Sequence, residues 1–104
     1  MVGTMTAFLY DMVEDVFDRL DDIMIYKYPK FIKCYWILKR YSEDISKVKY
    51  DDDDDDSLTI TVYAEKKKTI VAIAEDLDDY EDSEYSIVYN ANVDDKVITI
   101  SMHR

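Results

Sequence analysis

The chain has 104 residues, of which 24 are acidic and 13 basic, so its formal net charge is −11. This length favours a single domain over residues 1–104 with one core, and an apolar fraction of 48% argues against disorder throughout. The charge argues against direct binding to nucleic acid or to an anionic membrane and favours basic partners.

Residues 6–25 have the apolar period of an amphipathic helix. Apolar side chains recur at steps of three and four at Leu9, Val13, Val16, Leu20 and Ile23. The acidic residues between them fall mostly on the opposite face, and these are Asp11, Glu14, Asp15, Asp18, Asp21 and Asp22. The pattern therefore predicts a helix with an exposed acidic surface.

Pro29 interrupts the chain after this helix, because proline disfavours helical geometry in the residue before it. Residues 30–48 have a second apolar period and predict another helix. The run "CYWIL" within them also suits a buried strand, and Ser42 followed by two acids is a signal for a new helical turn. One helix, a split helix and a strand all remain open here.

Six consecutive aspartates occupy residues 51–56. Blocks of like charge repel one another and are usually exposed, which predicts an extended connector between a helical half, 4–50, and a sheet half, 57–103. The alternative is that the run belongs to an acidic surface. Helix 6–25 is also acidic, and seven of the ten residues 75–84 are acids, so three segments can form one continuous surface.

The second half of the chain has the period of strands. Apolar and polar residues alternate over 58–64, and further strands are predicted at 69–75, 85–90 and 96–102, with an acidic loop or a short helical turn at 76–84. The fold class is therefore α+β. We expect two N-terminal helices packed on one face of a four-stranded antiparallel meander, in the order ααββββ.

Catalytic and cofactor motifs are missing from the sequence. The aspartate run fails the calcium-loop pattern, because Asp56 stands where glycine is required and Val62 where glutamate is required. Cys34 lies in an apolar stretch, His103 is the only histidine, and Gly3 is the only glycine. We therefore expect no enzyme, no metal site and no cofactor.

Residues 27–49 are the basic part of the chain, with seven basic residues against two acids. Aromatic residues, Trp36 among them, are interleaved with these bases, a pattern seen in nucleic-acid-binding segments. Their helical spacing favours a role in the core instead, and the global charge opposes nucleic acid. Attraction between this segment and the acidic remainder of another copy predicts a weak homodimer through residues 26–40 or a sheet edge.

Three acidic stretches carry a resemblance to known proteins, namely "YDMVEDVFDRLDD", "DDDDDD" and "EDLDDYEDSE". A small, acidic, tyrosine-rich chain of this kind resembles the virus-encoded inhibitors of host defence, the anti-CRISPR proteins and DNA-mimic anti-restriction proteins. That resemblance implies a viral protein acting in the host cytoplasm. Immunity proteins and antitoxins are similar in size and charge, and a structural or assembly protein with an acidic solubility surface is the other alternative.

The function expected from these features is inhibition without catalysis. The chain would bind a basic nucleic-acid-binding protein, for example a CRISPR–Cas effector, by presenting carboxylates at a pitch comparable to that of phosphates. The absence of a long apolar stretch argues against a membrane partner. The candidate partner-binding residues are Asp11, Glu14, Asp15, Asp18, Asp22, Asp53, Asp54, Asp76, Asp78, Asp79, Tyr80, Glu81, Asp82 and Glu84.

Overall fold

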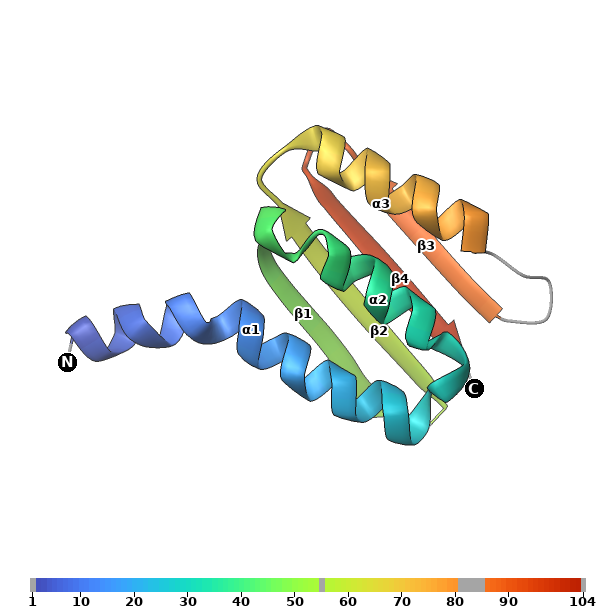
Figure 1. Ribbon diagram of the computed structural model, residues 1–104, viewed down its shortest axis with the longest axis horizontal. Helices are drawn as coiled ribbons and strands as arrows, with labels where there is room; N and C mark the ends of the chain where they lie inside the picture. The colour runs from blue at the N-terminus through green and yellow to red at the C-terminus, as the bar shows by residue number, and fades with distance from the viewer. Residues whose placement is uncertain (1, 55, 81–85, 104) are drawn as a thin grey trace.

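The computed structural model describes the backbone of residues 2–54, 56–80 and 86–103 and the side chains of residues 13–52, 56–79 and 87–103. The chain is an α+β protein (Figure 1). Its elements are α1 (Val2–Lys27), η1 (Pro29–Phe31), α2 (Ile32–Arg40), η2 (Ser42–Asp44), β1 (Ile45–Asp54), β2 (Ser57–Ala64), α3 (Lys67–Tyr80), β3 (Ser86–Asn92) and β4 (Val97–His103).

The described strands form one four-stranded antiparallel sheet, as the sequence predicted. Their spatial order is β1-β2-β4-β3, which differs from the expected meander. Two hairpins, β1–β2 and β3–β4, are linked by α3. Because α3 leads the chain across the sheet to its far edge, β4 returns beside β2 and the two become the central strands.

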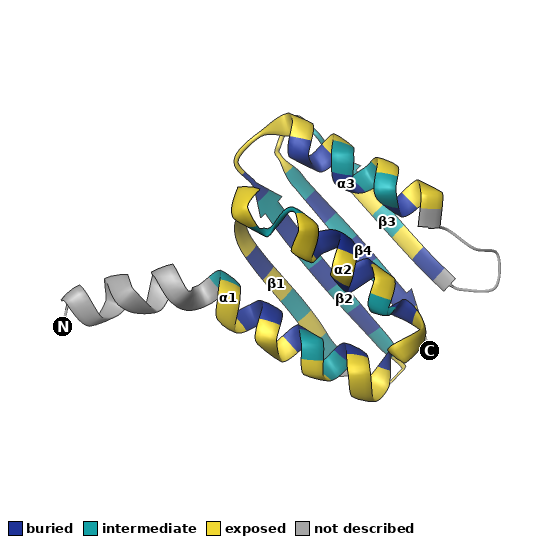
Figure 2. Cartoon of the chain, viewed as in Figure 1, coloured by how far each residue is buried: buried dark blue, intermediate teal, exposed yellow. Residues whose placement is uncertain are grey.

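The core lies between the helices and the sheet. Buried residues alternate with partly exposed ones along β2 and β4, which places one row of apolar side chains on each strand (Figure 2). Ile60 of β2 pairs with Ile100 of β4, and both are fully buried. Phe17, Leu20 and Met24 of α1 belong to the same cluster of buried residues. In Figure 1 the C-terminal part of α1 runs alongside β1, and α2 lies between α1 and α3.

Helix α1 confirms the helix predicted over residues 6–25. Val16, Phe17, Leu20 and Met24 are buried along one stripe, and acids occupy the positions between them. The helix ends at Lys27, two residues before Pro29. The prolyl ring favours non-helical geometry in the residue before it, so the chain turns here. The 3₁₀ turn Pro29–Phe31 then leads directly into α2.

Strand β1 corrects the prediction of a connector at 51–56 and of helix continuing to residue 48. Ile45 and Val48 are buried and pair with residues of β2. The aspartates from Asp51 to Asp54 form the last part of this edge strand, so the predicted connector is largely strand. Charged residues are common on edge strands because they oppose pairing with other chains.

Helix α3 corrects the strand predicted at 69–75. For residues 76–80 it agrees with the helical alternative, whereas 81–84 lie outside the described residues. Ile70, Ile73 and Leu77 are buried at steps of three and four, which is the period of a helix rather than of a strand. The alternating residues of "TIVAIA" obscured this period in the sequence. Strands β2, β3 and β4 overlap the ranges predicted at 58–64, 85–90 and 96–102, and these strands are confirmed.

Cys34 of α2 lies in the core with no exposed surface, and this burial raises the pKa of its thiol from 9.0 to about 12. At pH 8 we expect a disulfide reagent to label the folded chain at least about a hundredfold more slowly than the unfolded chain, because the thiolate is the reactive form. Release of the coloured thiol product over time, with and without denaturant, measures both rates.

The raised pKa of the Cys34 thiol also predicts how the stability of the fold changes at high pH. The folded pKa exceeds the unfolded value, so the contribution of Cys34 to stability is complete below about pH 9 and is lost as the pH rises towards about 12. Cys34→Ala serves as the control, because this variant removes the titrating group. Equal labelling rates for the folded and unfolded chains would contradict the buried position of Cys34.

Candidate functional site

The outward surface of α1 is acidic. Glu14, Asp15, Asp18 and Asp22 are exposed, because the apolar stripe that includes Phe17 turns the opposite face of the helix inward. No ion pair within the described part of the chain includes any of these four carboxylates. Their charges therefore face solvent without a compensating base in direct contact.

Acids of α1 affect the ionisation of a neighbouring tyrosine. Tyr35 of α2 packs edge-on against Phe17 of α1, with ring centroids 5.9 Å apart. Burial raises the pKa of the Tyr35 hydroxyl, and the charges of Asp21 and then Asp18 raise it further. A negative potential thus extends from α1 towards α2.

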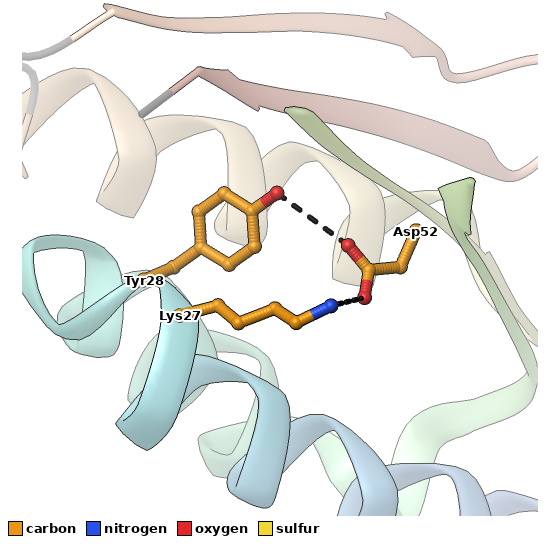
Figure 3. Close-up of polar contacts among 3 residues, drawn as sticks. All are labelled: Lys27, Tyr28 and Asp52. Atoms are coloured by element: carbon orange, nitrogen blue, oxygen red, sulfur yellow. Dashed lines mark hydrogen bonds and ion pairs between the residues drawn. The ribbon is translucent and has the colours of Figure 1, made fainter. Parts of the chain in front are cut away.

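Two hydrogen bonds join the acidic end of β1 to residues at the C-terminal end of α1 (Figure 3). The Lys27 Nζ donates a hydrogen bond to Asp52 Oδ2 at 2.9 Å, and the hydroxyl of Tyr28 donates a longer one to Asp52 Oδ1 at 3.5 Å. Asp51 next to Asp52 is exposed. We call the four exposed acids of α1 (Glu14, Asp15, Asp18 and Asp22), together with Asp51 and Asp52 of β1, the acidic edge.

Two basic residues of α1 lie near this surface. Arg19 lines a shallow depression together with Val16 and residues 48–52 of β1, and Lys27 forms an ion pair with Asp52. Both are on the side of α1 that faces the end of β1. The acids on the rest of the outer face of α1 thus remain the dominant charges there.

The acids of α3 do not join the acidic edge. Helix α2 lies between α1 and α3 (Figure 1), and it carries the exposed bases Lys33, Lys39 and Arg40. Arg40 Nη1 forms an ion pair with Asp76 Oδ2 of α3 at 3.0 Å. The expected continuous surface of three acidic segments is therefore replaced by two regions separated by a basic helix.

Two of the candidate acids on α3 are engaged within the chain. Asp76 accepts a hydrogen bond of 2.7 Å from the Tyr41 hydroxyl in addition to its ion pair with Arg40. This hydrogen bond, followed by burial, raises the pKa of Tyr41. Asp78 accepts a hydrogen bond from the Tyr89 hydroxyl of β3, whereas Asp79 is exposed. These internal contacts make α3 a weaker candidate than α1.

The side chains of the other predicted residues are outside the described part of the chain. Asp11, Asp53, Asp54 and Tyr80 belong to the backbone of α1, β1 and α3, but their side chains are outside the described set. Glu81, Asp82 and Glu84 lie outside the described residues altogether. Of the described candidates, the four acids of α1 and Asp79 of α3 are exposed with no internal contact among the described residues, whereas Asp76 and Asp78 are engaged.

Two aromatic residues are exposed, although the helical spacing of the aromatics favoured the core. The dimer predicted through residues 26–40 requires exposure of this kind. Trp36 is 66% exposed and Tyr26 is 82% exposed. The signal was present for Trp36, which lies three residues after Lys33 and four before Arg40, on the polar side of α2. The buried stripe of the same helix passes through Cys34 and Leu38 instead.

The described residues contain no group of three or more histidine, cysteine or carboxylate side chains placed to hold a metal ion. Within that same part of the chain, no helix combines the length and apolar character needed to cross a membrane. A depression of about 290 Å³ lies between α1 and α2, and Glu14, Asp18, Lys39 and Glu43 are among the residues that line it. Exposed carboxylates of this kind are suited to binding guanidinium and ammonium groups.

Comparison with known proteins gives no relative, since neither a family model nor a curated protein nor a solved structure matches the chain. The residues of the chain itself are therefore what indicates its function.

Proposed function

We propose that the chain is a non-enzymatic inhibitor that binds the basic nucleic-acid-binding surface of a host defence protein, such as a CRISPR–Cas effector, in the host cytoplasm. The observation that carries this proposal is the acidic outer face of α1. Its four exposed carboxylates have no ion-pair partner among the described residues, so they are available to the bases of another protein.

The spacing of these acids supports mimicry of nucleic acid. Each DNA strand carries one charge per roughly 3.4 Å of axis, and helix residues three or four apart lie about 5–6 Å from one another. Asp15, Asp18 and Asp22 are spaced in this way along α1. A groove that binds phosphates through lysine and arginine would therefore meet a line of charges of similar density.

The proposal includes a particular placement of the helices. We take α1 and α2 to pack on one face of the sheet, so that the outer surface of α1 points away from it. In this arrangement the acidic edge, from Glu14 to Asp52, presents one border of the molecule to a partner. The same physics would serve an immunity protein that masks a basic nuclease, and the identity of the bound protein separates these two roles.

An affinity pull-down from host lysate, followed by a competition assay, tests the proposal. We expect the captured protein to be basic and to bind DNA or RNA. Added chain should release a labelled oligonucleotide from that protein, and raising the salt concentration should weaken the inhibition, because salt screens charge attraction between the two proteins.

A second measurement decides between inhibition and a surface that serves only solubility. If the acids only keep the chain soluble, the captured protein retains its oligonucleotide at every concentration of the chain, and that result would overturn the proposal. An acidic protein of similar charge and unrelated sequence is the matched control. Displacement by that control as well would reduce the effect to unspecific electrostatics.

A further inference from the structure

A second surface of the chain is aromatic and basic, and the proposed inhibition does not use it. It is formed by the outer side of α2, where Lys33, Trp36, Lys39 and Arg40 are exposed. We call these four residues the α2 stripe. Its tryptophan is 66% exposed, although a side chain of this size is highly buried on average. An exposed tryptophan between bases is typical of a protein-binding surface.

We propose that the α2 stripe binds the acidic face of α1 in a second copy of this chain, forming a twofold-symmetric homodimer. Charge complementarity selects this partner. The overall charge of −11 opposes a nucleic acid as the occupant of the stripe, whereas Glu14, Asp15, Asp18 and Asp22 offer carboxylates on another copy.

The arrangement of the two helices suits such a symmetry. Helices α1 and α2 are in direct contact, because Phe17 packs on Tyr35 and the Lys39 Nζ lies 5.3 Å from the centre of the Phe17 ring. A twofold axis through the groove between them places each α2 over the α1 of the partner. The same contact then occurs twice, as twofold pairing requires.

The existing contacts of the bases leave this pairing feasible. Arg40 already forms an ion pair with Asp76, but its side chain is 65% exposed, so it can approach a second carboxylate. Lys39 lies over Phe17 at the edge of the groove that Glu14 and Asp18 also line. Repulsion between two acidic chains acts at longer range, and physiological salt screens it within about 8–10 Å.

Sedimentation of the purified chain at several protein concentrations tests the proposal without any target. Because the dimer and the inhibited protein would compete for the same acids of α1, a measurement on the chain alone keeps the two outcomes distinguishable. We expect the mass to rise from 12.3 kDa towards twice that value. Trp36→Ala should raise the dimer dissociation constant at least tenfold. Val88→Ala is the matched control, since Val88 is 63% exposed on β3, and it should leave that constant unchanged.

Charge exchange gives a test that does not depend on the loss of an interaction. One variant carries Lys33→Glu and Lys39→Glu, and the other carries Asp15→Lys and Asp22→Lys. Each alone should be monomeric, because like charges then meet in both contacts. Their equimolar mixture should form a dimer, because opposite charges are restored in both contacts, and this recovery shows that both variants are folded.

Three results would overturn the proposal. The first is a mass of 12.3 kDa at every concentration of the native chain. The second is a dimer that Trp36→Ala leaves unchanged, which would place the interface elsewhere, for example at the edge of β3. The third is a mixture of the two charge variants that stays monomeric while both have the circular dichroism spectrum of the native chain.

Discussion

Reversal of three carboxylates on α1, by Asp15→Lys, Asp18→Lys and Asp22→Lys, is expected to weaken binding to the basic target by roughly a hundredfold or more. The three side chains are exposed, so the fold should survive the change. Each reversal replaces attraction by repulsion, and like charges facing each other across an interface cost several kcal/mol. A hundredfold loss corresponds to about 2.7 kcal/mol.

A variant with the same change in charge at other sites provides the control. Glu65→Lys, Glu75→Lys and Asp94→Lys alter three exposed acids outside the acidic edge. Calorimetric titration of both triple variants into the target compares them at equal net charge. If the two lose affinity equally, total charge rather than the surface of α1 determines binding, and the proposed site is wrong.

Phe17→Ala is expected to lower the free energy of unfolding by about 3–5 kcal/mol, the usual cost of removing a buried phenylalanine ring. Phe17 is 1% exposed, packs against Tyr35 and lies beneath Lys39. The change leaves a cavity between α1 and α2, on the buried side of the helix that carries the exposed acids. Urea denaturation followed by circular dichroism measures the loss, with the midpoint converted to a free energy.

An exposed apolar residue of the sheet is the control for this prediction. Val88→Ala removes two methyl groups from a side chain that is 63% exposed, so it should change the free energy of unfolding by less than about 0.5 kcal/mol. A cost below about 1 kcal/mol for Phe17→Ala would contradict the close packing of α1 on α2. It would also remove the reason for treating the acids of α1 as rigidly placed.

Much of the fold could be predicted from local periods in the sequence. The stripe through Val16 and Leu20 indicated α1, and the alternation from Leu58 to Ala64 indicated β2. In both elements one face is buried and the other is partly exposed or polar, so the period of the side chains repeats the period of the backbone. Three of the four strands followed from such segments. The fourth predicted strand, 69–75, is part of α3, and β1 takes its place in the sheet.

The two misassigned segments depended on contacts with distant residues. In β1 the strand continues into aspartates that no local preference would place in a sheet, and its pairing with β2 holds them there. In α3 the β-branched residues Ile70 and Ile73 suit a strand, but burial against neighbouring elements selects the helix. Tertiary packing outweighed local propensity in both cases.

The candidate site was predictable only in part, for a related reason. Exposure of Asp15 and Asp18 followed from the helical period of α1. The separation of the acids of α3 from those of α1 did not, because it depends on α2 lying between the two helices. The contact of Asp52 with Lys27 was likewise hidden, since the two residues are 25 positions apart.

The exposure of Trp36 has a consequence for spectroscopy. This residue is the only tryptophan in the chain, and it is on the surface of α2 rather than in the core. Its fluorescence already reports a largely aqueous environment in the folded monomer, so emission would shift little on unfolding. A shift to shorter wavelength instead reports that another surface has covered α2, which makes the indole a natural optical sensor of what lies on this helix.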